Sequence, residues 1–144
     1  MTDRPNLEQL LDAVRIHLES LVIPAVRAEP KLYFQTLVAV NVLKIAQREV
    51  AHGQALSETE WASLNALTGE AASISADLRA ASDALTVRNR ALSADIRAGK
   101  YDEPGVSTRL AQHVENVVGG QLMLNAPTLA QRLRAEDDTG EYPA

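Results

Sequence analysis

The chain has 144 residues, of which 46% are hydrophobic, and this is enough for one domain with a core of ordinary size. It contains no cysteine, which excludes disulfides, thiolate metal sites and cysteine nucleophiles. A formal net charge of −5 at pH 7 disfavours contact with a phosphate backbone, so we expect no nucleic acid partner.

The N-terminal residues lack the basic and then apolar run of a signal peptide. A membrane-spanning helix needs roughly 20 apolar residues, and the longest apolar candidate, Leu37 to Leu43, is short and contains Asn41. We therefore expect a cytoplasmic protein with no membrane partner.

Apolar residues recur every three or four positions, which predicts helices almost throughout. The first helix begins after Asn6, a good N-cap residue, and ends at Pro24. The second begins at Pro30, which suits the first helical turn, and ends at Gly53.

Ser57 and Glu60 have the spacing of a capping box, and hydrophobic residues flank them at the positions of a hydrophobic staple. This pattern predicts a separate short helix over residues 58–67 that closes at Gly69.

The next apolar residues keep a near-heptad spacing and predict one long helix from Ala71 to Ala98, with a break at Ser82 and Asp83 as an alternative. Several faces of this helix are rich in Ala and Ser. They permit close helix pairing either within the domain or between two copies, so a homodimer is one option for the assembly.

A turn-rich link over residues 100–105 precedes a helix that begins at Val106. At Gly119 and Gly120 this helix either bends or allows a neighbouring backbone to come close. A short helix follows Pro127. The prediction is therefore an all-α single-domain bundle of five to six helices over residues 1–135, with residues 136–144 as a disordered acidic tail.

Four polar side chains lie inside the apolar stripes of four different predicted helices: His17, Asn41, Asn89 and His113. Their positions predict that all four point into the bundle. A buried polar group without a partner costs a few kcal/mol, so they must meet one another, backbone carbonyls or water. Either they form a structural hydrogen-bond network, or they line a polar pocket for a small ligand.

Metal chemistry has weak support. Glu49 and His52 have the Glu-x-x-His spacing of di-iron bundles, but the second such pair is missing. A mononuclear zinc or nickel site would need His17, His52 and His113 to converge from three helices. No nucleophile elbow or phosphate loop is present, so we expect no catalytic residues, no metal and no cofactor.

The segment from Val38 to Glu49, together with Arg4-Pro5, Leu10-Leu11 and Ala13-Val14, resembles a small helical bacterial family of unknown function. Similar pieces of its C-terminal half are Leu92, Ile96 to Gly99, Asp102 and Leu122 to Pro127. One departure is Asn125-Ala126-Pro127, where the family has Asn-Pro. The resemblance implies a place beside, or fused to, aminoglycoside- and choline-kinase-like phosphotransferases and acyl-CoA dehydrogenases.

Three functions stay open. The preferred one is a non-catalytic accessory or interaction domain that works with such a phosphotransferase or acyl-CoA enzyme. The second is a small-molecule-binding bundle with a polar internal pocket, and the third is a metal-dependent enzyme that uses histidines.

Overall fold

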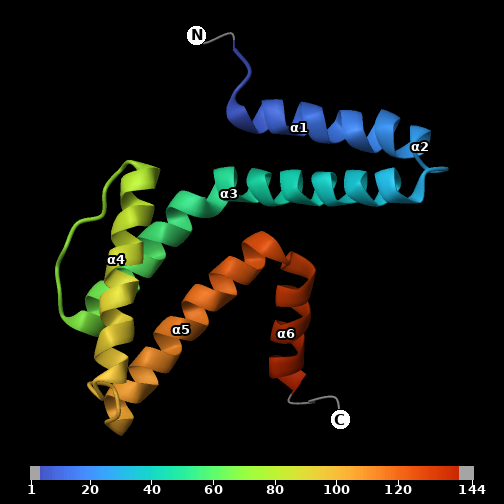
Figure 1. The fold of residues 1–144 in the computed structure, drawn as a ribbon. Helices are drawn as coiled ribbons and strands as arrows, with labels where there is room; N and C mark the ends of the chain where they lie inside the picture. The colour runs from blue at the N-terminus through green and yellow to red at the C-terminus, as the bar shows by residue number, and fades with distance from the viewer. Residues whose placement is uncertain (1–3, 140–144) are drawn as a thin grey trace. The chain divides into compact units, whose positions relative to one another are not determined.

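The computed structural model describes the backbone of residues 4–139 and the side chains of residues 4–135, and it confirms the all-α fold class (Figure 1). The elements in chain order are α1 (Leu7–His17), a π-helical stretch η1 (Leu18–Val22), α2 (Ile23–Ala25), α3 (Pro30–Thr68), α4 (Leu78–Arg97), α5 (Pro104–Asn125) and α6 (Pro127–Thr139). None of the described helices combines the length and the apolar character that a bilayer crossing requires.

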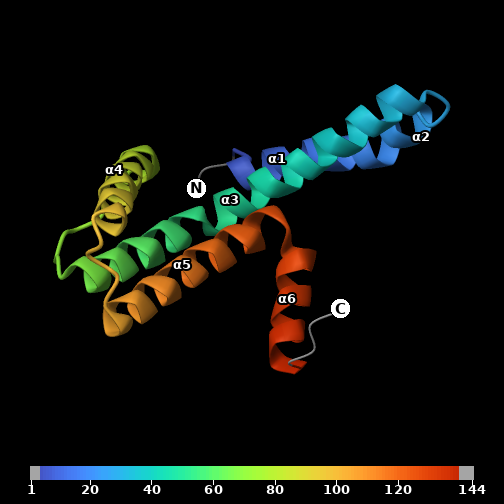
Figure 2. The same ribbon diagram turned by 60° about the horizontal axis from the view of Figure 1, so that its bottom comes forward.

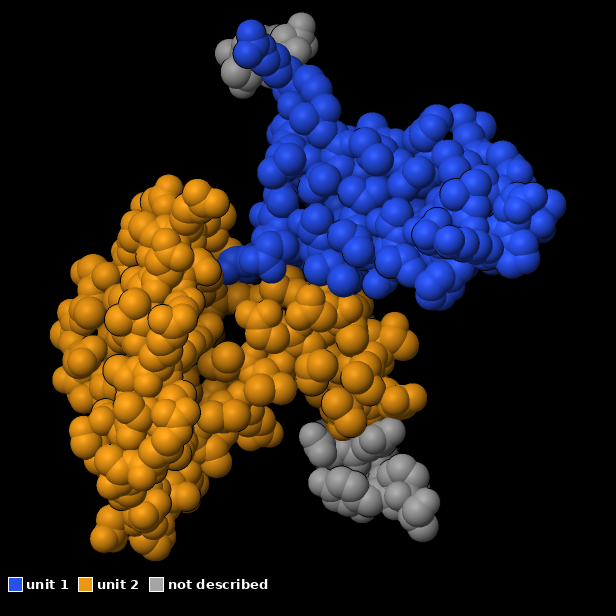
Figure 3. Space-filling model, viewed as in Figure 1, with its two compact units in different colours: residues 1–53 blue, residues 54–144 orange. Residues whose placement is uncertain are grey.

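The chain divides into two compact units, Met1–Gly53 and Gln54–Ala144, which Figure 3 shows in different colours. We call them unit 1 and unit 2. Helix α3 continues across the division, so it supplies one helix to each unit. The single domain over residues 1–135 stays a prediction.

The start of α1 confirms the predicted N-cap. Asn6 Oδ1 accepts from the backbone N–H of Gln9 at 2.8 Å, and Gln9 Oε1 accepts from the N–H of Asn6 at 2.9 Å. This reciprocal pair satisfies two backbone donors that the first helical turn leaves free. At the other end the helical path continues through η1 and ends at Ala25, one residue after Pro24.

Within unit 1, α1 and the first half of α3 lie side by side (Figures 1 and 2). Polar side chains link them. Lys44 Nζ of α3 lies 2.8 Å from Glu19 Oε1, and Gln47 Nε2 donates to Asp12 Oδ1 at 3.2 Å. Arg15 of α1 forms an ion pair with each of these two acids. Its Nη2 lies 2.5 Å from Asp12 Oδ1, and its Nη1 lies 2.5 Å from Glu19 Oε2.

The predicted separate helix over 58–67 is wrong, because α3 runs without a break through Gly53 and Ser57 to Thr68. A glycine inside a helix costs only about 1 kcal/mol relative to alanine, so it does not enforce an end. Glu60 does not fold back to cap a helix start. Its Oε1 accepts from Asn89 Nδ2 of α4, so tertiary contacts take the place of the local capping box.

The predicted start of the next helix at Ala71 is also wrong, since residues 70–77 form an extended connection and α4 begins at Leu78. Two α3 side chains hold this connection, because Trp61 Nε1 and Asn65 Nδ2 both donate to the carbonyl oxygen of Ala72, at 2.8 and 2.9 Å. Asp77 then caps α4 by accepting from the N–H of Ala80 at 2.8 Å. The alternative break at Ser82 and Asp83 does not occur.

The core of unit 2 is small and lies between α3 and α4. Its buried members are Trp61, Leu64, Leu85 and Leu92, and partly buried residues pack around them: Leu67, Ile74, Ala84, Tyr101 and Leu110. Leu64 is completely buried, at 0% exposure. Its α3 members Trp61 and Leu64 are sequence neighbours of Glu60 and Ser63, whose polar side chains contact α4 and α5.

Helix α5 runs without a break through both glycines, where the sequence left a bend or a close neighbour as alternatives. A Cβ added at Gly120 would lie 2.9 Å from Leu56 Cδ2, whereas one at Gly119 would meet nothing within 4 Å. Gly120 therefore permits a close approach between α5 and α3, and the neighbour that comes close is a side chain rather than backbone. Helix α6 extends to Thr139 and so includes the first residues of the predicted tail, while residues 140–144 lie outside the described part.

Candidate functional site

Two hydrogen-bonded pairs converge on one face of α3 in unit 2. His113 Nδ1 of α5 lies 2.7 Å from Ser63 Oγ, and Asn89 Nδ2 of α4 donates to Glu60 Oε1 at 2.7 Å. Glu60 and Ser63 are three residues apart, which places them on the same side of the helix. We call these four residues the polar cluster.

His113 is the buried member of the cluster, since only 5% of it is exposed. Burial lowers the pKa of this imidazole because it disfavours the charged form, and the negative charge of Glu60 offsets part of that effect. The ring is therefore neutral near pH 7. A neutral imidazole has one donor and one acceptor nitrogen, and a serine hydroxyl can play the complementary role.

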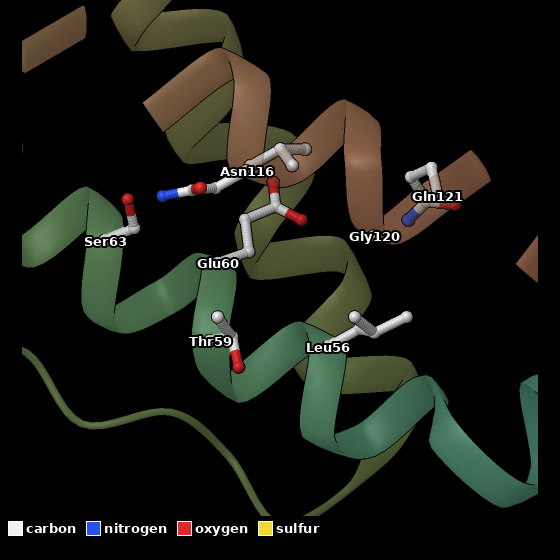
Figure 4. Close-up of a pocket in the computed structure, with 8 residues that line it drawn as sticks. Leu56, Thr59, Glu60, Ser63, Asn116, Gly120 and Gln121 are labelled. Carbon is white, nitrogen blue, oxygen red and sulfur yellow. The ribbon is translucent and has the colours of Figure 1, made fainter. Parts of the chain in front are cut away.

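A small cavity adjoins the cluster between α3 and α5 (Figure 4). In this view Glu60, Ser63 and Asn116 point toward one another, and the side chain of Leu56 lies on the side of α3 that faces Gly120. The cavity volume is about 20 Å³, which is enough for one water molecule and far below that of a drug-sized ligand pocket. A hollow of about 160 Å³ lies on the His113 side of Ser63, where Arg109 and Gln112 line it.

The four residues predicted from the sequence do not share one environment. His113 is buried and Asn89 is partly buried, and α3 supplies a partner to each. His17 and Asn41 are exposed, so the prediction that they point inward is wrong for these two. The physical reason is that α1 and η1 meet α3 through polar side chains, among them Asp12 of α1 and Glu19 of η1, which leaves the apolar stripes of His17 and Asn41 uncovered.

The sequence reasoning missed Glu60 and Ser63 as members of the cluster. Glu60 was assigned to a capping box, and its spacing from Ser63 was the one available signal that both could serve a common face. Nothing in the sequence marks Ser63 as the partner of a histidine 50 positions away.

The polar contact between α1 and α3 is the second electrostatic feature. The hydrogen bond from Arg15 lowers the pKa of Asp12, and the one from Lys44 lowers the pKa of Glu19. Both acids stay charged through the neutral range. Because these groups are open to solvent, the contact aligns the two helices more than it stabilises them.

No group of three His, Asp or Glu side chains in the described part of the chain could hold a metal ion. His52 is exposed, and the carboxylate of Glu49 lies over Gly53, where it would clash with an added Cβ at 2.7 Å. Glu49 and His52 are therefore not part of a metal-holding group among the described residues.

Acid is expected to destabilise unit 2 through His113. Its pKa is lower in the folded chain than the ordinary value of 6.5, so the unfolded chain binds more protons between these two values. The stabilising contribution is complete above pH 6.5 and is lost as the pH falls toward the folded pKa. Urea titrations over this range should show a falling free energy of unfolding for the parent chain.

His113→Gln should flatten this slope, because the amide cannot titrate but can still bond to Ser63. The matched control is His17→Gln, which alters an exposed histidine and should leave the slope in place. An identical pH profile for the parent and His113→Gln would show that His113 is not the responsible group.

Comparison with known proteins identifies one family model that matches the chain. The family model described as "Domain of unknown function (DUF6285)" matches residues 26–129. No curated protein and no solved structure matches the chain.

Proposed function

Because the chain belongs to the DUF6285 family of domains of unknown function, we propose its role from its own surface: it is a non-catalytic interaction domain, and unit 1 carries its contact surface. The observation that carries the proposal is the exposure of the apolar stripe on α1. The stripe consists of Leu7, Leu10 and Val14 of α1 and continues to Leu21 of η1, and these side chains are between 50% and 62% exposed.

Exposed apolar residues concentrate in unit 1. Among the described residues, 17 large hydrophobic side chains are exposed, and 11 of them lie in residues 1–53. Single exposed hydrophobics are ordinary, but contiguous stripes mark surfaces that bind other proteins. The spacing of three and four residues places Leu7, Leu10 and Val14 on one side of α1, where another protein can cover them.

The proposed partner is an enzyme of the kinase-like phosphotransferase or acyl-CoA dehydrogenase class. Its support is the resemblance carried by the segment from Val38 to Glu49. An accessory domain needs an exposed contact face, and α1 supplies one.

The sizes of the cavities beside the polar cluster favour this function over the small-molecule alternative. The cavity of about 20 Å³ next to Glu60 and Ser63 accommodates water rather than a metabolite, and the hollow of about 160 Å³ beside His113 is also smaller than a drug-sized ligand pocket. The cluster then acts as a hydrogen-bond network that sets how α3, α4 and α5 pack.

Co-expression with a candidate enzyme of each class, followed by affinity capture, tests the proposal. Val14→Asp places a charge in the stripe and should lower capture at least about tenfold, because an apolar contact would have to desolvate the carboxylate. The matched control is Ile16→Asp, since both residues are about half exposed, at 50% and 47%, but Ile16 lies off the stripe.

The two variants give a clear decision. Capture that survives Ile16→Asp but not Val14→Asp supports the interaction domain. Failure of the parent chain to capture either enzyme at micromolar concentration, or equal capture of both variants, rejects the proposal for this face.

A further inference from the structure

Helix α3 has a second exposed apolar face in unit 1, separate from the stripe on α1. It consists of Phe34, Leu37, Val38 and Val42, which are between 39% and 66% exposed, with exposed Asn41 among them. These positions follow the three and four residue spacing of one helix side. We call this surface the α3 face.

The opposite side of α3 is already occupied. Thr36 and Val40 are buried there, and Gln47 on the same side donates to Asp12 of α1. The spacing of these positions, four and seven residues, places them together. Helix α1 therefore cannot cover the α3 face without giving up contacts that it makes.

The charges at the ends of the α3 face are arranged for an antiparallel pairing. Lys31 precedes the face and Glu49 follows it, and both are exposed. They are about five helical turns apart at 3.6 residues per turn, so they lie on the same flank of the helix. An antiparallel copy of the same helix would bring each lysine next to a glutamate, twice across a two-fold axis.

Asn41 lies near the midpoint between Lys31 and Glu49 and is also self-complementary. Its carboxamide donates through nitrogen and accepts through oxygen, so two Asn41 side chains can bond to each other across a two-fold axis. A single asparagine in an apolar helix contact selects register and partner number in paired helices. Neither Lys31 nor Glu49 could meet its own copy in this way.

We propose that the α3 face binds the α3 face of a second copy of this chain in an antiparallel two-fold contact. This goes beyond the proposed function, because it uses a different face and a different partner. Unit 1 has equal numbers of acidic and basic residues, six of each, so two such units do not repel each other. The whole net charge of −5 therefore comes from unit 2, which would disfavour pairing there.

Sedimentation of the full chain over a range of micromolar concentrations provides the first test. The parent should shift from monomer to dimer as concentration rises. Val38→Glu should raise the dimer dissociation constant by about a hundredfold, because two carboxylates would be buried close together. Ala39→Glu is the matched control, since it adds the same charge at an exposed position off the face and should leave the constant within about threefold.

A charge exchange tests the antiparallel arrangement and does not depend on core packing. Lys31→Glu and Glu49→Lys should each weaken the dimer by about tenfold, and the double variant should restore it. A parent chain that stays monomeric at every concentration overturns the proposal. So does a dimer that Val38→Glu leaves intact, or a double variant without rescue.

The result is independent of the enzyme partner. A monomer that still captures an enzyme through α1 rejects the dimer and leaves the interaction domain in place. A dimer that captures no enzyme supports the dimer contact and rejects the interaction domain.

Discussion

Trp61→Ala is expected to lower the free energy of unfolding of unit 2 by about 3–5 kcal/mol, the range for removing a buried large aromatic side chain. Three interactions would be lost together. The ring packs in the core cluster with Leu64 and Leu85, its Nε1 donates to the carbonyl of Ala72, and the guanidinium of Arg88 lies 4.4 Å from the ring centroid. Urea unfolding followed by far-UV circular dichroism would measure the change.

Trp61→Phe separates packing from hydrogen bonding. It keeps an aromatic ring in the core but removes the donor to Ala72, so we expect a loss of about 1–2 kcal/mol. Unfolding midpoints in the order parent, Trp61→Phe, Trp61→Ala would support both roles. An unchanged midpoint for Trp61→Ala would show that the core of unit 2 does not depend on this side chain.

Leu64→Ala is expected to cost about 2–5 kcal/mol, because the residue is the completely buried member of the same cluster and its truncation leaves a cavity. Trp61 is the one tryptophan in the sequence, so its fluorescence reports the unfolding of this region directly. The relevant measure is the shift of the urea midpoint at constant slope.

Leu78→Ala is the matched control for Leu64→Ala. It makes the same chemical change in the same unit, but Leu78 is 52% exposed at the start of α4. We expect a loss within about 0.5 kcal/mol. Equal effects at the two positions would mean that the core described for unit 2 is misplaced.

Several helix ends that depend on local chemistry could be predicted, although the end predicted at Gly53 was wrong. Asn6 caps α1 as expected, α3 begins at Pro30, and Gly69 and Gly99 follow the ends of α3 and α4 with φ values of +73° and +78°. Each of these signals acts through the backbone of its own turn, where a missing Cβ or a side-chain acceptor decides the conformation.

Signals that compete with tertiary contacts could not be read in the same way. Ser57 and Glu60 have the pattern of a helix start, yet Glu60 bonds to Asn89 and the helix continues. The residues after Gly69 have a helical pattern, yet they form a non-helical connection whose Ala72 carbonyl accepts from Trp61. In both places a partner distant in sequence outweighs a local preference worth about 1 kcal/mol.

The same distinction between local signals and tertiary contacts applies to the candidate site. His113 could be identified as an inward polar residue from its place in an apolar stripe, and the structure buries it. Its partner Ser63 could not, because a serine in a helix has no spacing that identifies a distant imidazole. Packing of α5 against α3 brings the two together.

The composition and the spacing of the apolar residues were sufficient to predict the all-α class and to predict which residues share a helix side. Which of those sides is covered followed from packing: the stripe around His113 faces the interior of unit 2, while the equally regular stripes around His17 and Asn41 face outward. The physical reason is that burial is a property of two surfaces. An amphipathic pattern describes one of them, and the identity of its neighbour depends on contacts such as Glu19 with Lys44 that form between distant segments.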